Sequence, residues 1–247
     1  MKNNIVILGD SFTYGQGCSD KEFYYDNDLK RTVGDRDDFR KGPSKYCWAS
    51  LLQTYYPKYN IINLAEPGND NAYMLANAYK HVNDDTALLI FSGTMIPRMH
   101  VPDVFSDDNS LGPWVMGSHG DFPTRAETGL DEQSYRGVKD VHAAKKYFLK
   151  YIYSEEMFSI YALNALYAAY GLAKRYNAKF MWSIYPYEDP KHVAYADNLA
   201  DMKFISATHW YRNVQAPCKS KDNHLNNLGH AFYFGEVVLP KVKEILE

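Results

Sequence analysis

The alternation of short apolar runs with longer segments of helical periodicity most constrains the fold of this chain. Apolar runs of strand length occur at residues 5–8, 59–64, 87–91 and 179–185, with a weaker one at 203–206. Apolar residues recur at helical spacing within residues 46–56, 70–82, 154–176 and 227–246. Strands that alternate with helices of this length favour a parallel sheet covered on both faces by right-handed crossovers. We therefore expect the α/β fold class.

Two segments do not follow this alternation of strands and helices. Residues 19–45 are charged and punctuated by glycine and proline, and residues 97–137 are rich in Pro, Gly, Asp and Ser. Both would leave the carboxyl edge of the sheet, where long loops commonly shape a substrate site. The length of 247 residues suits one domain. We expect a single domain over residues 1–247, with insertions at about 19–45 and 97–137.

Composition excludes several classes of protein. The net charge of −3 provides no basic field for nucleic acid. The first apolar run is too short for a signal peptide, and no run approaches the length of a membrane span. The 3 cysteines are too scattered for a disulfide framework or a metal site. These features predict a soluble, cytoplasmic protein without a signal peptide or a bound metal, and they leave its oligomeric state open.

A candidate nucleophile follows the first apolar run directly. The tripeptide Gly9-Asp10-Ser11 ends that strand and leads into a glycine-containing turn. In open α/β sheets, ligands bind at the carboxyl ends of the strands, which is where this hydroxyl would lie. A serine hydroxyl reacts near neutral pH only with a base in hydrogen-bond reach, a group that orients the base, and donors for the oxyanion.

The rest of the chain offers those groups. Asp222 and His224 lie two residues apart in the turn before the last helix, so the carboxylate can reach Nδ1 and leave Nε2 to face a serine. An exposed polar turn capped by the aspartate is the alternative interpretation. Gly68 follows the second strand, where a glycine lets the backbone N–H approach a substrate, and the Ser11 amide is a second donor. Asn69 or Asp70 could cap the helix that follows.

Three blocks in this order resemble the SGNH (GDSL-type) hydrolase family, serine esterases and lipases with a flavodoxin-like three-layer α/β/α sandwich. They are Gly-Asp-Ser at 9–11, Asn-x-Ala-x-x-Gly at 63–68 and Asp-x-His-x-Asn-x-x-Gly-His at 222–230. The resemblance implies that Ser11 is the nucleophile, Gly68 an oxyanion donor, Asp222 the orienting acid and His224 the base. We also predict substrate contacts for Asp10, Asn71 and Arg98.

The chain departs from the family pattern after the third strand. The family usually has Gly-x-Asn-Asp there, and the Asn side chain is its third oxyanion donor. Gly93-Thr94 matches the first two positions, but Met95 stands in place of the asparagine. Thr94 and Arg98 are candidates for the missing donor, or for binding an anionic group. Loss of one such donor typically lowers turnover by about 10²–10³.

These residues lead to two hypotheses. The first is a serine hydrolase of small acyl esters, such as an O-acetylated carbohydrate, with a Ser-His-Asp triad that needs no cofactor. The second is a catalytically weak protein that binds a glycan or a protein partner, motivated by Met95, the two insertions and 22 tyrosines. A metal site of Asp222, His224 and His230 is disfavoured, because six residues along a helix point His230 to another face.

Overall fold

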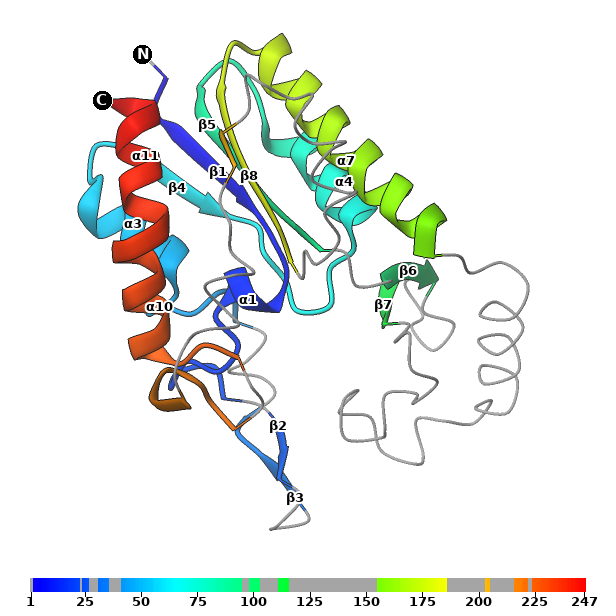
Figure 1. Cartoon of the computed structure of the whole chain (residues 1–247), viewed down its shortest axis with the longest axis vertical. Helices are drawn as coiled ribbons and strands as arrows, with labels where there is room; N and C mark the ends of the chain where they lie inside the picture. The colour runs from blue at the N-terminus through cyan, green and yellow to red at the C-terminus, as the bar shows by residue number, and fades with distance from the viewer. Residues whose placement is uncertain are drawn as a thin grey trace.

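The computed structural model describes residues 2–22, 24–26, 31–35, 41–94, 98–102, 111–115, 155–185, 203–204, 216–221 and 224–247. A sheet of 5 parallel strands forms the centre of the molecule (Figure 1). In sequence order its strands are β1 (Asn4–Leu8), β4 (Asn60–Asn63), β5 (Thr86–Thr94), β8 (Lys179–Tyr185) and β9 (Lys203–Phe204). Their spatial order is β4-β1-β5-β8-β9. The first strand of the chain is thus second in the sheet, which is the flavodoxin-like order that the family resemblance implied.

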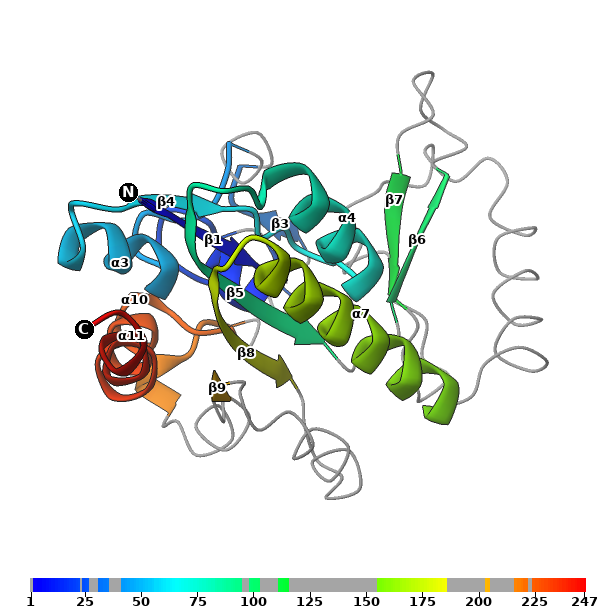
Figure 2. The ribbon, with the colours of Figure 1, turned by 90° about the horizontal axis from the view of Figure 1, so that it is seen from above.

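Helices cover both faces of the sheet, as Figure 2 shows from above. One face carries α4 (Asn71–His81) and α7 (Glu155–Arg175). The other face carries α3 (Trp48–Tyr55), α10 (Asn227–Tyr233) and α11 (Leu239–Leu246). The predicted α/β/α sandwich is therefore confirmed. Asp70, one of the two predicted caps of α4, accepts a hydrogen bond from the Tyr73 N–H at 2.7 Å.

Alternation along the central strands divides the core into two layers. In β1, Val6 and Leu8 pack beneath α4 and α7, whereas Ile5 and Ile7 pack beneath α3, α10 and α11. All four side chains are fully buried. Strands β5 and β8 alternate in the same way. A strand buried on both faces needs a continuous apolar run, and this explains the 5–8 and 87–91 sequences.

The last predicted helix is divided. Residues 227–246 form α10, a π-helical turn at Phe234–Val238, and α11. Pro240 lies in the first turn of α11 and has no N–H to donate to the carbonyl four residues earlier. The wider turn before the proline accommodates this missing bond, since helices commonly kink or bulge at such positions.

The two insertions contain strands that the sequence did not predict. The first contributes β2 (Tyr24–Asp26) and β3 (Arg31–Val33), and the second β6 (Arg98–Pro102) and β7 (Leu111–Val115). Each pair forms a separate antiparallel ribbon. Such short strands are held by their partner across the ribbon, so they leave little periodicity in the sequence. The single-domain boundary remains a prediction.

Among the residues described, no helix is both long enough and apolar enough to span a membrane.

Candidate active site

Ser11 is the first residue of the short helix α1 (Ser11–Tyr14), which begins just after the carboxyl end of β1. Asp10 caps this helix, because its carboxylate accepts the Phe12 N–H at 3.0 Å. Gly15 ends the helix with a φ of 85°, a left-handed conformation that glycine adopts without strain. Both ends of α1 are thus fixed, and Ser11 is 5% exposed at this edge of the sheet.

His224 belongs to a turn that is closed on itself. The N–H and hydroxyl of Ser220 both donate to the His224 carbonyl, at 2.8 and 3.0 Å. Lys219 and Leu225 form an isolated β-bridge across the turn. The Asn226 side chain caps α10 through the Gly229 N–H at 3.0 Å and also donates to the Pro217 carbonyl at 2.8 Å. The turn therefore enters α10 with a defined direction.

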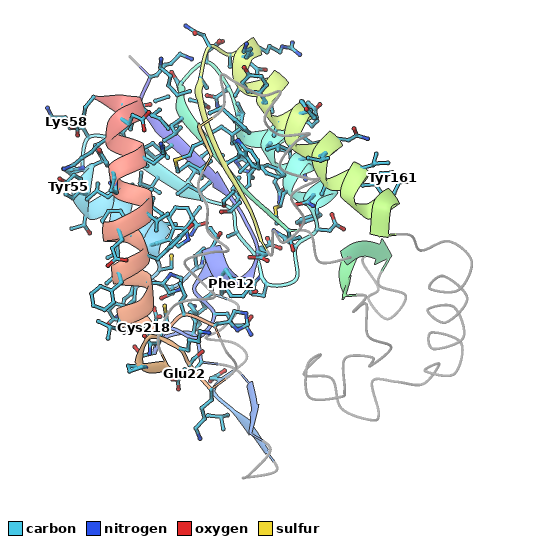
Figure 3. All side chains as sticks on the ribbon, in the orientation of Figure 1. Phe12, Glu22, Tyr55, Lys58, Tyr161 and Cys218 are labelled. Carbon is cyan, nitrogen blue, oxygen red and sulfur yellow. The ribbon has the colours of Figure 1, made fainter. Side chains whose placement is uncertain are left out.

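The turn of α1 that carries Ser11 lies against the turn that carries His224, which we call the histidine turn. His224 Nε2 lies 3.0 Å from Ser11 Oγ, across 213 residues of sequence. The ring of Phe12 packs on the imidazole, with centroids 4.8 Å apart and an interplanar angle of 37°. Figure 3 shows Phe12 on α1 and Cys218 in the segment that leads to α10. A serine hydroxyl at this distance from an imidazole can pass its proton to that ring.

The second block supplies a tight turn beside Ser11. Gly68 has a φ of 81°, and the Asn69 N–H donates to the Glu66 carbonyl at 3.2 Å. Glycine at the third position with positive φ is typical of a type II turn. Among the described residues, no hydrogen bond uses the N–H of Ser11 or that of Gly68. Both amides are thus available to a ligand.

Two asparagine side chains tie the blocks together. Asn69 is fully buried and donates from Nδ2 to the Gly9 carbonyl at 3.0 Å, beside the Glu66 N–H, which donates to the same oxygen at 3.2 Å. The Asn71 amide pairs with the backbone of Thr94, accepting its N–H at 2.9 Å and donating to its carbonyl at 2.5 Å. The turn at Gly68 is thereby fixed to the end of β1 on one side and to the end of β5 on the other.

Gly93 makes room for the contact between Asn71 and Thr94. A Cβ at Gly93 would lie 2.9 Å from Asn71 Oδ1 and 2.8 Å from Phe91 Cε1. Thr94 itself is 1% exposed. The third block is therefore closely packed, although it lacks the family's asparagine.

The remaining predicted residues are described only in part. Asp222 and Met95 lie outside the described residues, and of Arg98 the structure describes the backbone, in β6. Asp10 caps α1 with its carboxylate, and Asn71 holds Thr94. Substrate contacts for Asp10, Asn71 and Arg98, and the roles of Gly68 and Thr94 in an oxyanion hole, remain predictions.

His230 lies apart from Ser11, in the core. It is fully buried, and its Nδ1 accepts the Trp48 N–H at 3.3 Å, at the start of α3. Burial, and then the charge of His224, lower the pKa of His230 to about 3. A search of the described part of the chain finds no group of three His, Cys, Asp or Glu side chains able to hold a metal ion.

The sequence did not predict the roles of two residues near Ser11, namely Asn69 and Phe12. Asn69 was considered only as a helix cap, and its bond to Gly9 depends on how β1 and β4 pair. Phe12 carries a sequence signal, because an apolar residue directly after the nucleophile must pack on something at the edge of the sheet. Neither role could be assigned without the tertiary arrangement.

Comparison with known proteins adds to this geometry. No protein-family model matches the sequence, and no curated protein matches it. The crystal structure of TesA superposes with a TM-score of 0.52 at 11% identity, covering 99% of this chain and 100% of that one. A GDSL-like lipase from Bacteroides thetaiotaomicron gives 0.48 at 12% identity, covering 99% and 90% of the two chains. A carbohydrate esterase gives 0.49 at 12% identity, covering 100% and 69%.

The likeness is one of fold alone, since the identity to TesA is 11%. TesA matches over the full length of both chains, and the sheet order and both helical layers follow the prediction made from the three blocks. The chain has the fold of the SGNH (GDSL-type) hydrolases.

Proposed function

We propose that this protein is a serine hydrolase of small acyl esters. One observation carries the proposal: Ser11 Oγ lies 3.0 Å from His224 Nε2 at the carboxyl edge of the sheet. Two free amides support it, that of Ser11 itself and that of Gly68, in the turn bonded to the Gly9 carbonyl. The fold is compatible with such a function but does not establish it.

In the proposed reaction, the Ser11 hydroxyl attacks the acyl carbonyl while His224 Nε2 accepts its proton. The N–H groups of Ser11 and Gly68 donate to the oxyanion of the tetrahedral intermediate. His224 then protonates the leaving alcohol, and a water molecule activated by the same imidazole releases the acid. Asp222 would accept a hydrogen bond from His224 Nδ1 and so keep the proton on that nitrogen.

Small acyl groups, such as acetyl on a carbohydrate, are the proposed substrates. The reacting edge carries closely packed side chains, with Thr94 at 1% and Asp10 at 3% exposed. Thr94 or Arg98 would supply the third oxyanion donor. A protein with only two donors would still be an esterase, slower by about 10²–10³.

The test compares the wild type with Ser11→Ala on p-nitrophenyl acetate and on O-acetylated sugars. We expect Ser11→Ala, His224→Ala and Asp222→Ala each to lower kcat by at least about 10³-fold, since triad members act as a unit. Ser50→Ala is the matched control, because it removes a serine hydroxyl on α3 that donates to the Ser44 carbonyl. A folded wild type no faster than Ser11→Ala on every ester would refute the proposal.

A second candidate is a catalytically weak protein that binds a glycan or a protein partner. Met95 favours it, because methionine offers no oxyanion donor where the family has asparagine. A fluorophosphonate probe separates the two candidates, since it reacts with a serine that its base has activated. Labelling that Ser11→Ala abolishes favours the hydrolase, and absence of labelling favours the binding protein.

A further inference from the structure

The contact between Ser11 and His224 depends on how two turns are held against each other. The histidine turn is closed by Ser220, which bonds to the His224 carbonyl, and by the bridge between Lys219 and Leu225. Its own bonds fix its shape, but they do not fix its distance from α1. The Phe12 ring contacts the imidazole, and a second connection between α1 and the histidine turn helps to set that distance.

The segment that follows α1 makes this connection. The Ser19 N–H donates to Asn227 Oδ1 at 2.9 Å, and Asn227 Nδ2 donates to Ser19 Oγ at 2.9 Å. The side-chain amide of Asn227 thus forms hydrogen bonds with both the backbone and the side chain of Ser19. Two parallel bonds fix orientation as well as distance, which a single exposed bond does not.

Close backbone packing reinforces the pairing of Ser19 with Asn227. Gly17 is buried with a φ of 93°, and a Cβ there would lie 2.5 Å from Ser220 Oγ and 2.8 Å from His224 Cβ. The segment from Gly17 to Ser19 therefore lies against the histidine turn at one end and is bonded to α10 at the other. A shift of Ser19 relative to Asn227 would change the position of His224.

Asn227 is not needed to start its own helix. It is the first residue of α10, and the preceding Asn226 already caps that helix through the Gly229 N–H. The Asn227 side chain instead reaches across 208 residues of sequence to Ser19. This leaves the connection between the two turns as its role.

We propose that Asn227, acting through Ser19, is a positioning residue that sets the separation of Ser11 Oγ and His224 Nε2. The proposal rests on the proposed function for its kinetic consequence. Its structural consequence, the separation itself, does not depend on any activity.

The experiment uses the full chain with Asn227→Ala, Asn227→Asp and Ser19→Ala. Misplacement of a reacting group by about 1 Å can cost 10²-fold, so we expect Asn227→Ala to lower kcat by about 10- to 100-fold, with KM for p-nitrophenyl acetate unchanged. Asn227→Asp can accept from both the N–H and the hydroxyl of Ser19, and we expect it to restore most of kcat. Ser19→Ala keeps the N–H bond, so its loss should be smaller.

Asn60→Ala is the matched control. It removes an exposed amide that donates to Asn4 Oδ1 at 3.2 Å, at the opposite end of the sheet. We expect kcat and the thermal midpoint of this variant to match the wild type. Combining Ser19→Ala with Asn227→Ala should lower kcat no further than Asn227→Ala alone, because both changes remove one connection.

A crystal structure of Asn227→Ala tests the separation directly. We expect Ser11 Oγ and His224 Nε2 to lie more than 3.5 Å apart. An unchanged separation would overturn the proposal, and so would wild-type kcat in Asn227→Ala when Ser11→Ala is inactive. Equal rates for wild type and Ser11→Ala would instead overturn the proposed function, and the measured separation would then still decide the role of Asn227.

Discussion

The two sides of Ser11 are held in different ways. On the side of the second and third blocks, the side chains of Asn69 and Asn71 bond to the backbone of Gly9 and Thr94, in buried or half-buried positions. On the side of the base, an exposed pairing of Ser19 with Asn227 and a close glycine contact hold His224. The side with the proposed oxyanion donors is therefore part of the core, whereas the proposed base, His224, is held at the edge of the core. Changes on the first side should lower stability and rate together, and changes on the second should lower mainly the rate.

Gly17→Ala should have the largest effect on the base side. The added Cβ would lie 2.5 Å from Ser220 Oγ, and the φ of 93° disfavours any side chain. We expect kcat/KM to fall by about 10²-fold or more, because the histidine turn must move away from Ser11. Steady-state kinetics on p-nitrophenyl acetate measures the loss.

Gly42→Ala separates the clash from the backbone strain. Gly42 has a φ of 105°, yet no heavy atom of the described residues lies within 4 Å of an added Cβ. Both variants carry about 1–2 kcal/mol of left-handed strain, but only Gly17→Ala carries the clash. Equal losses of activity in the two variants would mean that the contact with the histidine turn is unimportant.

Asn69→Ala should have the largest combined effect on the oxyanion side. The variant removes a fully buried donor to the Gly9 carbonyl, two residues before Ser11. We expect the free energy of unfolding to fall by about 1–2 kcal/mol, the range for a lost buried hydrogen bond, and kcat to fall about 10-fold. Urea unfolding and kinetics on the same preparation give both quantities.

Asn227→Ala provides the contrast for Asn69→Ala. Its bonds to Ser19 are exposed, so the free energy of unfolding should change by less than about 0.5 kcal/mol while kcat falls. If Asn69→Ala lost activity without losing stability, the distinction between the two sides of Ser11 would be wrong.

The sequence predicted the parts of the fold that depend on periodicity. The five apolar runs correspond to β1, β4, β5, β8 and β9. The runs in β1 and β5 are almost continuously apolar, because a strand buried on both faces needs such a run. The ribbons in the insertions were not predicted, since their short strands pair mainly with each other. The π-helical turn before Pro240 was also not predicted, although a proline within a helical pattern indicates a kink or an interruption of the helix.

The site was predictable only where the residue type limits the chemistry. Ser11 and His224 could be paired because three blocks in a fixed order resemble a known family, in which these two positions act together. The amides of Asn69, Asn71 and Asn227 could not be placed, because asparagine in a turn bonds to many kinds of partner. Their partners are fixed by strand pairing and by the approach of distant turns.

The smallest expected effect is that of His230 on the pH dependence of stability. This residue lies in α10, the helix that follows the histidine turn. Its Nδ1 accepts the Trp48 N–H, and the side chain of Cys47, the N-cap of α3, makes no capping hydrogen bond. His230 thus joins α10 to the start of α3 in the core. Burial lowers its pKa from 6.5 to about 3, so the native state excludes a proton that the unfolded state binds.

Stability should therefore fall as the pH is lowered through 6.5, with a slope of up to about 1.4 kcal/mol per pH unit. The loss continues toward the native pKa of about 3 and is absent above pH 7. His230→Asn keeps an oxygen that can accept the Trp48 N–H but cannot bind the proton, so the difference in free energy of unfolding between wild type and variant should shrink from pH 7 to pH 5. Equal pH slopes in urea unfolding would mean that the packing of α10 on α3 does not keep the proton from this imidazole.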